Sequence, residues 1–543
     1  MTYSNFKITE KQAKSILFDQ FNIKVSAFPL PGEIDLNFRV KVAGGEGYIL
    51  KVSRPGEDVN FLDFQQRMLE YVDQTGVDLI SPKVVKDKNG DAISSFKDEF
   101  GNLRSVRLLT WVSGRLWSSV NPQRDDLRFS LGEQCGKLTS ALQGFDHPKA
   151  HREFEWDVAR SLWTENNLDL FSGDKLEAVS FFQDRFKRQL DTYNMLRKSV
   201  LHNDANDNNI IVSSDLISPK VKAVIDYGDA VYTQIINDVA IAGAYAIMHH
   251  NDPLAAALSI VKGYHATFPL EAGELGHLYN AIAMRLVISV TKSALNKIAE
   301  PENEYLLISE RPAWELLRKW RKTDPDLAHF SFRHACGYPA HPNREKFDSW
   351  ASKSKFSQGQ LFPASAKNDV HLLNLSVSST WLGHQREFVD LELFQFKIDR
   401  LQKKIPEKLL AGGYLEPRAV YNSPAYDKIG NSGRESRTIH LGIDFWLPAT
   451  TPVHTILDGE VITAVDNAGD KEYGGLVILK HRIGELIFYT LYGHLSVKSA
   501  TKHQVGDQLM SGDLIGRLGE TNENGNWATH LHFQTMLSLL DYK

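Results

Sequence analysis

Several polar residues in the middle of the chain have the types and spacing that phosphoryl transfer requires. His202 and Asp204 are followed by Asn209, and Asp226 begins an Asp-Tyr-Gly-Asp run. A carboxylate such as Asp204 can orient a substrate hydroxyl, while the amide oxygen of Asn209 and the carboxylate of Asp226 are ligands that Mg²⁺ prefers. The set therefore predicts phosphoryl transfer from ATP, with His202 orienting the loop.

The segment between these residues has the pattern of a β-hairpin. An apolar run at 210–212 is followed by a polar turn at 213–219 and a second apolar run at 221–225. A hairpin brings its two ends together, so we expect Asp204 to lie near Asp226. The alternative is that Asn and Asp are present only because turns favour them, but this does not explain why the acids fall at the mouth of the hairpin.

This part of the chain resembles the aminoglycoside phosphotransferase and choline kinase-like superfamily, whose loop reads His-x-Asp-x-x-x-x-Asn followed by Ile-Asp-Phe-Gly-Asp. Here Tyr227 replaces the Phe. Within the superfamily the chain looks most like the branch that contains hydroxylysine kinase, because of Trp156-Asp157, Asp238-Val239-Ala240 and the run at 303–306. The resemblance implies a two-lobed α/β (α+β) protein kinase-like domain over residues 1–343, with ATP and Mg²⁺ as cofactors.

The same resemblance implies a nucleotide site in the first lobe. Gly32 and Asn37 belong to an expected strand-turn-strand cover for the phosphates. Lys51 lies on the expected third strand, where its amine would reach the α- and β-phosphates. Leu109 and Trp111 belong to the expected hinge, whose backbone would meet adenine.

The helix expected at 61–72 departs from the family pattern, in which a Glu pairs with the lysine. This helix offers Asp63, Gln65 and Glu70, of which Gln65 is nearest to the expected place. The partner of Lys51 is therefore left open.

Helices are expected to position these residues from about 127 to 320. Two stripes of apolar residues recur at three- and four-residue steps, which predicts buried helix faces: Leu131, Cys135, Leu138 and Leu142 form one, and Leu275, Leu278, Ile282 and Leu286 form the other. After Asn343 the composition shifts towards Ser, Lys and Gln, most clearly at 352–358. We interpret 344–413 as a loosely packed connector, with a strand at 372–381 and a helix at 394–404.

A second set of residues, in a β-rich region, has metal-ligand spacing. His440 and Asp444 are four positions apart, His494 lies in a Tyr-Gly-His-Leu run, and His530 and His532 would point to one face of a strand. Three ligands of the His, Asp, His type leave tetrahedral Zn²⁺ a fourth position for water, which is the catalytic pattern. Water bound in this way becomes a nucleophile near neutral pH.

This region resembles the lysostaphin-like zinc endopeptidases, which cut peptide crosslinks in bacterial cell walls and carry His-x-x-x-Asp and His-x-His motifs with a further His between them. The resemblance implies a small mainly-β domain at 414–543. Its zinc ligands would be His440, Asp444 and His532, while His494 and His530 would act on the water and the developing oxyanion.

Two other histidines of this region, His481 and His503, carry no motif, and we expect them at the surface. The alternative for a single buried histidine is a core residue that binds nothing.

Composition restricts the partners. The net charge of -5 is spread without long runs, so neither nucleic acid nor an anionic membrane is an expected partner. Cys135 and Cys336 are the two cysteines and lack metal-type spacing, which fits either a reducing compartment or a chain that simply makes little use of cysteine. Residues 1–20 lack the apolar core of a signal peptide, and no stretch approaches eighteen apolar residues, so the sequence predicts a cytoplasmic protein.

The principal activity expected is ATP-dependent phosphorylation of a hydroxyl on a small amine-bearing metabolite, an amino alcohol or a hydroxylated amino acid. A zinc peptidase-like domain, with a peptide as a second substrate, would be fused to it. One alternative makes hydrolysis of peptidoglycan-type peptides principal and the kinase-like domain a regulatory or ligand-sensing module. Another treats either half as a binding module only.

The oligomeric state cannot be read from the sequence. The resemblance of the two halves also implies fusions of these two domain types with a C-terminal class III aminotransferase, so we expect this chain to be the front part of a longer protein that continues past Lys543.

Overall fold

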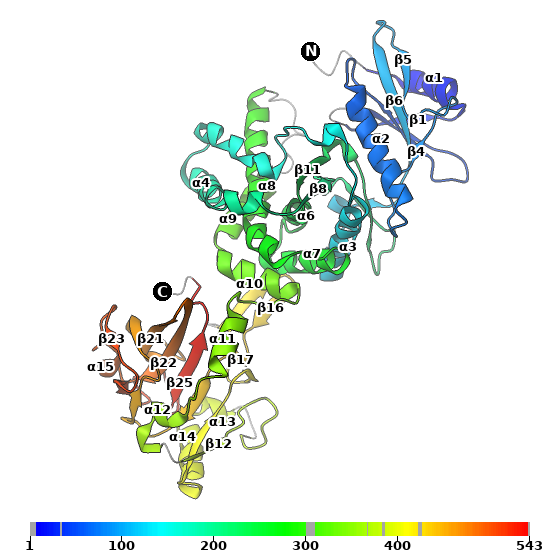
Figure 1. The fold of residues 1–543 in the computed structure, drawn as a ribbon. Helices are drawn as coiled ribbons and strands as arrows, with labels where there is room; N and C mark the ends of the chain where they lie inside the picture. Colours follow the sequence, from blue (N-terminus) through cyan, green and yellow to red (C-terminus); the bar gives the residue numbers. More distant parts are fainter. Residues whose placement is uncertain are drawn as a thin grey trace. The chain divides into compact units, whose positions relative to one another are not determined.

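The computed structural model describes residues 7–32, 35–299, 310–365, 368–382, 386–421 and 426–540. The chain divides into two compact units, Met1–Tyr338 and Pro339–Lys543 (Figure 1). The run at 303–306, which contributed to the family resemblance, lies outside the described residues. Among the helices that the structure describes, none has both the length and the apolar character that crossing a bilayer requires.

The first unit begins with an antiparallel sheet flanked by two helices, α1 (Glu10–Phe21) and α2 (Val59–Gln74) (Figure 1). The strand order is β1-β2-β3-β6-β4, and β5 also pairs with β6. The strands are β1 (Ala27–Leu30), β2 (Leu36–Val40), β3 (Tyr48–Val52), β4 (Val84–Val85), β5 (Ser94–Lys97) and β6 (Leu103–Thr110). Lys51 therefore lies on the third strand, as predicted.

Successive side chains of a strand point to opposite faces of the sheet, so the position of a residue decides whether it packs on the side of α1 or on the side of α2. Leu50 and Leu108 are cross-strand partners and belong to the hydrophobic core that includes α1. Leu109 belongs to the core that includes α2. Lys51 and Arg107 are also cross-strand partners, one position along from Leu50 and Leu108, so they face α2.

The rest of the first unit is mainly helical, as the sequence predicts, and every residue of the two predicted stripes is buried. The helices are η2 (Trp117–Ser119), α3 (Asp125–Ala141), η3 (Pro148–Ala150), η4 (Val158–Leu170), α4 (Gly173–Arg188), α5 (Leu190–Asn194), η5 (Tyr227–Asp229), α6 (Ile236–Ala246), α7 (Pro253–Thr267), α8 (Ala272–Ala299), α9 (Glu310–Arg321) and α10 (Pro325–Ala335). The long helix α8 packs against η4, α4, α6, α9 and α10, and its central part is buried on all sides.

The predicted hairpin is confirmed. Strands β9 (Ile210–Val212) and β10 (Val221–Val224) are antiparallel, and the amide of Ile225 donates to the carbonyl of Asn209 (2.8 Å). Next to this hairpin β7 (Arg115–Leu116) pairs with β9, while β8 (Lys198–Leu201) pairs with β11 (Val231–Gln234). The loops that follow β8 and β10 carry the predicted site residues.

The second unit is built on an eight-stranded sheet with the order β12-β13-β18-β25-β22-β21-β20-β23. These strands are β12 (Asp369–Leu372), β13 (Lys408–Gly412), β18 (Ile443–Trp446), β20 (Gly459–Asn467), β21 (Gly474–Ile483), β22 (Leu486–Leu495), β23 (Gln508–Leu509) and β25 (Leu531–Met536). Three short two-stranded sheets accompany it, formed by β14 (Glu416–Pro417) with β17 (Ile439–His440), β15 (Asp427–Gly430) with β16 (Gly433–Ser436), and β19 (Pro452–His454) with β24 (Leu514–Arg517). Its helices are α11 (Arg344–Ala351), α12 (Gln358–Leu361), η7 (Pro363–Ser365), α13 (Arg386–Val389), α14 (Leu391–Lys404) and α15 (Val497–Ala500).

The range predicted as a connector, 344–413, differs from that expectation. It supplies β12 and β13, the first two strands of the sheet. Leu361 and Phe362 are 4 % and 2 % exposed and share a hydrophobic core with Leu409. The Ser- and Lys-rich composition was misleading because the few apolar residues scattered through it are the ones that pack.

The strand predicted at 372–381 is wrong beyond its first residue, because β12 ends at Leu372. The amide of Ser376 donates to Oδ1 of Asn374 (2.9 Å), and the amide of Ser378 donates to Oγ of Ser376 (3.2 Å). Such local bonds between side chains and backbone compete with a strand ladder. The helix predicted at 394–404 is confirmed within α14.

Truncating a side chain in the predicted connector tests whether this range is core. We expect Phe362→Ala to lower the free energy of unfolding of the second unit by about 3–5 kcal/mol, because it leaves a cavity beside Leu409. Phe356→Ala is the matched control, since Phe356 is 42 % exposed. Urea unfolding followed by circular dichroism measures both, and equal small effects would contradict the packing.

Candidate active sites

Asp204 lies on the loop after β8, and three donors hold its carboxylate. Asn206 and Asn209 donate to Oδ2 (2.9 and 2.7 Å), and Arg285 donates to Oδ1 (2.8 Å). Burial, together with the nearby Asp229, raises the pKa of Asp204 well above its usual value, whereas Arg285 lowers it. The structure therefore brings Asp204 and Asn209 together, as their spacing predicts.

Arg285 is a residue that the sequence analysis missed. It comes from α8, 81 residues after Asp204, and its side chain is 1 % exposed. The guanidinium also donates to the carbonyl of Trp156 (2.8 Å) and lies 4.7 Å from the centre of that ring. An arginine within an apolar helix pattern was the available signal, because a fully buried arginine needs an anionic partner.

His202 links the two ends of the hairpin. One ring nitrogen, Nε2, lies 3.0 Å from the carbonyl of Ile225, and Nδ1 accepts a bond from the amide of Asp204 (3.2 Å). A carbonyl only accepts, so Nε2 carries the hydrogen and the ring is neutral. Burial lowers the pKa of His202 to about 4, in keeping with an orienting role.

Two of the segments that pointed to a particular branch of the superfamily supply buried acids, Asp157 and Asp238. The carboxylate of Asp238 accepts a bond from the Thr139 hydroxyl (3.2 Å), and burial raises the pKa of Asp238 to about 6. Asp157 caps the start of η4 and accepts a bond from the hydroxyl of Thr233 on β11 (2.8 Å). Asp238 also accepts a bond from the backbone of Asn203, so it supports the loop directly, whereas Asp157 joins η4 to β11.

Asp226 follows β10 and meets the lysine of the first sheet. Its φ of 66° is in the left-handed region, which non-glycine residues adopt rarely and mostly at functional or strained positions. Nζ of Lys51 lies 3.1 Å from Oδ1 of Asp226 and lowers the pKa of that carboxyl against the effect of burial. The side chain of Asp226 is 48 % exposed, so a cation can reach it from solvent.

Gly32 and Asn37 lie close together beside Lys51. A Cβ atom on Gly32 would lie 2.5 Å from Nδ2 of Asn37, and Asn37 is the cross-strand partner of Lys51. Oδ1 of Asn37 is buried and has no hydrogen-bond partner in the described part of the chain. A buried polar atom of this kind usually has a ligand or water as its partner.

Of the predicted hinge residues, Leu109 lies on β6 and Trp111 follows the end of that strand. Leu109 is paired within the sheet with Ile49 and Val84. The amide of Trp111 donates to the carbonyl of Gly47 (3.0 Å). Their contact with adenine stays a prediction.

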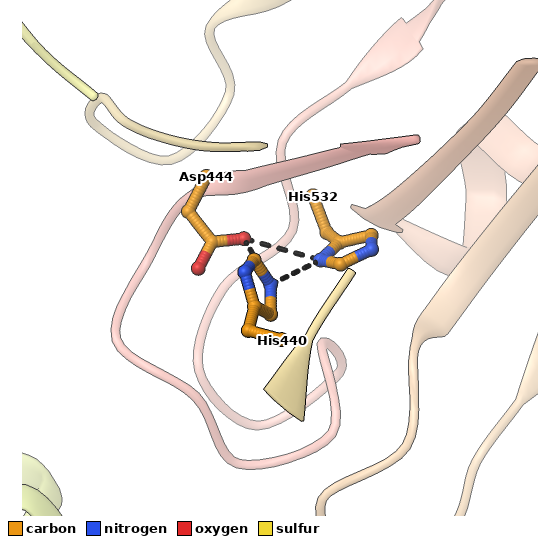
Figure 2. Close-up of side chains that lie close together, drawn as sticks. All are labelled: His440, Asp444 and His532. Carbon is orange, nitrogen blue, oxygen red and sulfur yellow. Dashed lines mark hydrogen bonds and ion pairs between the residues drawn. The ribbon is translucent and has the colours of Figure 1, made fainter. Parts of the chain in front are cut away.

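The second unit brings three possible metal ligands together. Nε2 of His440 lies 2.9 Å from Nδ1 of His532, and Oδ1 of Asp444 lies 3.2 and 3.1 Å from these two nitrogens (Figure 2). Tetrahedral zinc bonds of about 2.0 Å place ligand atoms about 3.3 Å apart. The donor set therefore fits Zn²⁺, and among the described residues it is the one such group of His, Cys, Asp and Glu side chains.

The second ring nitrogen of each of the two histidines lies near an oxygen of a neighbouring residue. Nδ1 of His440 lies 2.7 Å from the carbonyl of Gly413, and Nε2 of His532 lies 3.4 Å from Oε1 of Gln534. Oxygen partners of this kind place the hydrogens on those nitrogens, so the two nitrogens that face each other carry lone pairs. Two facing lone pairs repel each other, and a cation between them removes the repulsion.

Arg418 holds the second oxygen of Asp444 and was also missed in the sequence. Its NH1 donates to Oδ2 of Asp444 (2.7 Å), and its Nε donates to Glu416 (2.7 Å). Burial would raise the pKa of Asp444, but Arg418 and the surrounding histidines hold it well below the usual value. Asp444 therefore presents Oδ1 alone to the centre of the group.

His494 and His530 lie beside this group, with ring centres 4.3 Å apart. Their Nδ1 atoms lie 2.8 and 2.6 Å from the carbonyls of Asn524 and Ala528, so the lone pairs are on Nε2. Burial lowers the pKa of His530 to about 4 and that of His494 well below its usual value. Both rings are therefore neutral near pH 7 and can accept a proton or position water.

Gly442, between two of the ligands, lies against the third. A Cβ atom at this position would lie 2.5 Å from both Cε1 and Nε2 of His532. The loop between His440 and Asp444 can approach His532 because residue 442 has no side chain. The sequence contained a signal for this close approach, namely a glycine inside the His-x-x-x-Asp motif, at a position where the ligand spacing alone does not require one.

The expectation that His481 lies at the surface is wrong. Its side chain is fully buried, with Nδ1 2.8 Å from the carbonyl of Asp458 and Nε2 2.7 Å from the hydroxyl of Thr490. His503 is partly buried, and its Nε2 lies 2.7 Å from the carbonyl of Ile515. Neither belongs to the metal-type group.

The buried pair of Arg285 and Asp204 generates a stability prediction. Arg285→Met should lower the free energy of unfolding of the first unit by about 3–5 kcal/mol, because it leaves a buried carboxylate without its cation. Arg318→Met is the control: Arg318 pairs with Asp174, and both side chains are about half exposed, so a loss of about 0–1 kcal/mol is expected. The two values come from urea titration, and similar losses would contradict the assigned importance of the buried pair.

Comparisons with known proteins agree with these two sets of residues. The model of the phosphotransferase enzyme family matches residues 27–273, and that of peptidase family M23 matches residues 438–539. Hydroxylysine kinase of Mus musculus is 29% identical over 336 residues, covering 57% of this chain and 89% of its own length. A solved structure of an amicoumacin kinase is 16% identical, covers 62% of this chain and 96% of its own chain, and aligns with a TM-score of 0.44.

The second unit has relatives of its own. Lysostaphin of Staphylococcus staphylolyticus is 35% identical over 104 residues, which is 18% of this chain and 19% of the relative. Glycyl-glycine endopeptidase ALE-1 of Staphylococcus capitis is 35% identical over 97 residues, which is 24% of that protein. The chain thus spans about a fifth to a quarter of these relatives. It joins a kinase domain of the phosphotransferase enzyme family to a C-terminal domain of peptidase family M23.

Proposed function

We propose that the first unit transfers a phosphoryl group from ATP to a hydroxyl of a small amine-bearing metabolite. The observation that carries this proposal is the contact between Lys51 and Asp226, 175 residues apart, next to the loop of Asp204 and Asn209. Lys51 would bind the phosphates, and Asn209 and Asp226 would hold Mg²⁺. Bound Mg²⁺ would bridge the phosphate oxygens and neutralise charge on them.

Asp204 is the group we assign to the acceptor. Its carboxylate is held in place by Arg285, Asn206 and Asn209, so it can orient the hydroxyl and take its proton. The similarity to a hydroxylysine kinase along most of that protein's length supports a hydroxylated amino acid or an amino alcohol as acceptor. The acids Asp207 and Asp229, both half-buried near this loop, suit an ammonium group on the same substrate.

Two substitutions separate the roles of the acids. Asp204→Asn should keep Mg²⁺-dependent ATP binding and lower turnover by about 10²–10⁴-fold, because the proton acceptor is lost. Asp226→Asn should instead weaken Mg²⁺-dependent binding of ATP. Calorimetric titration with ATP and a coupled assay of ADP release measure the two effects.

Asp215→Asn, in the exposed turn of the same hairpin, is the control for these variants. It should match the unmodified chain in both assays. Normal turnover by Asp204→Asn on a genuine substrate would refute the role assigned to Asp204.

For the second unit we propose zinc-dependent peptide hydrolysis. His440, Asp444 and His532 would hold the ion, and bound zinc would make water a stronger acid near neutral pH. One of His494 and His530 would take the proton of that water on its Nε2, and the protonated ring would then donate a hydrogen bond from Nε2 to the oxyanion, while the other would position the water. The similarity to a glycyl-glycine endopeptidase supports a peptide substrate rich in glycine.

Since the first activity uses ATP, we infer that both act in the cytoplasm. Peptides or small precursors, rather than intact wall, would then be the substrates of the second unit.

Metal content and hydrolysis should respond differently to different histidines. His532→Ala should lose most of the bound zinc, measured by atomic emission after preparation without chelators, and should lower the melting temperature of the second unit. His530→Ala should retain zinc and lose hydrolysis of a glycine-rich peptide.

The control is His454→Ala, since His454 lies on β19 outside the group and its Nδ1 lies 2.9 Å from the carbonyl of Gly512. It should keep both zinc and hydrolysis. A zinc-free unmodified protein would rule out the metal site, and a fully active His530→Ala would rule out its role in the reaction.

A further inference from the structure

Gln65, the helix residue nearest to the place where the family has the glutamate partner of the lysine, makes a different contact. Gln65 of α2 is 6 % exposed, and its Oε1 accepts a bond from NH1 of Arg107 on β6 (2.5 Å). In kinases of this fold the lysine of the third strand pairs with a helix glutamate, and this pair must be in place for catalysis. Here the helix offers a neutral amide, which bonds to a second cation.

The residue just before β2, Asp35, places a carboxylate next to Lys51 instead. Oδ2 of Asp35 is 3.8 Å from Nζ of Lys51 and forms a close ion pair with NH2 of Arg107. The side chains of Asp35, Lys51 and Arg107 are 11 %, 9 % and 3 % exposed. Asp35 therefore has two buried cations next to it, one on each of the neighbouring strands β3 and β6.

The charges of this network balance. Lys51 and Arg107 carry two positive charges, and Asp35 and Asp226 carry two negative charges. A glutamate at position 65 would add a third negative charge to a buried cluster that is already neutral, which costs free energy. The amide of Gln65 instead satisfies a donor of Arg107 without adding charge.

The geometry explains what the network does for the lysine. An ammonium held by Asp226 alone would lie against the acid that we assign to Mg²⁺. With Asp35 as a second partner, Nζ is shared between two carboxylates, at 3.1 Å from Asp226 and 3.8 Å from Asp35. Arg107 fixes Asp35, and through Gln65 it also ties this arrangement to α2.

We propose that Asp35 is the positioning residue of Lys51, in place of a helix carboxylate, and that Arg107 and Gln65 connect it to α2. This inference rests on the proposed nucleotide site. It assigns a function to Asp35, an acid that belongs to no sequence motif and lies between Gly32 and Asn37 of the expected phosphate cover. Asp35 acts through Lys51 and does not itself bind the nucleotide.

The test uses the full chain and measures binding of ATP with Mg²⁺ by calorimetry. Asp35→Asn, which keeps the shape and removes the charge, should weaken binding by about tenfold or more, because one partner of a buried charge network is lost. Adding Gln65→Glu to Asp35→Asn restores a negative charge beside Arg107 and should recover part of this loss. Gln65→Glu alone should not tighten binding, so the two substitutions should be strongly non-additive.

Asp98→Asn is the matched control, because it also removes a buried acid that pairs with an arginine of β6. Asp98 lies between β5 and β6 and pairs with Arg104, and the two side chains are 4 % and 1 % exposed. This variant should lose stability in urea and keep its affinity for ATP. If Asp35→Asn is too unstable to assay, Gln65→Glu alone still tests the proposal. Tighter ATP binding by this variant would show that a helix carboxylate positions Lys51 better than Asp35 does, and would contradict the proposal.

Lys51→Ala separates failure of this inference from failure of the proposed function. If Lys51→Ala loses ATP binding while Asp35→Asn binds normally, Asp35 is not the positioning residue and the nucleotide site stands. If neither variant changes binding, the nucleotide site itself is wrong and the inference falls with it.

Discussion

Both units depend on the same physical constraint, which is that a buried carboxylate needs a cation to balance it. Asp204 is paired with Arg285 and Asp444 with Arg418, and in the pair of Lys51 with the half-exposed Asp226 the buried partner is the lysine. In each pair the cation comes from a different element of the fold, so the site forms only when the tertiary structure does. Removing one partner of such a pair is far more costly than removing an exposed pair.

This constraint also orients each functional group. One oxygen of Asp444 is taken by Arg418, which leaves the other for a metal. The two oxygens of Asp204 are held separately, one by Arg285 and one by two asparagine amides. Carboxylates fixed in this way are already in position before a substrate or ion binds, which is the arrangement that catalysis favours.

The fold and the motif residues could be predicted from the sequence because their signals are local. The hairpin after Asn209, the helix stripes and the His-x-His strand each follow from residue spacing within a short window. The zinc-type group was also predictable, since its members belong to short motifs in a fixed order.

What could not be predicted are the long-range partners. Arg285 lies 81 residues from Asp204, and Asp35 lies 72 residues from Arg107, so no spacing rule connects them. The packing of the Ser- and Lys-rich range around Phe362 escaped prediction for a related reason, because a few apolar residues decide it. Tertiary contacts override composition at such positions.

The central claim is that the first unit phosphorylates a hydroxyl of a small amine-bearing molecule. It is tested most directly by supplying the full chain with ATP, Mg²⁺ and a panel of amino alcohols and hydroxylated amino acids, and identifying the product by mass spectrometry. We predict ADP release that depends on one of these acceptors, a product with one added phosphate on the hydroxyl, and no reaction with the matching compound that lacks the hydroxyl. ADP release that is the same with and without every acceptor would contradict the claim.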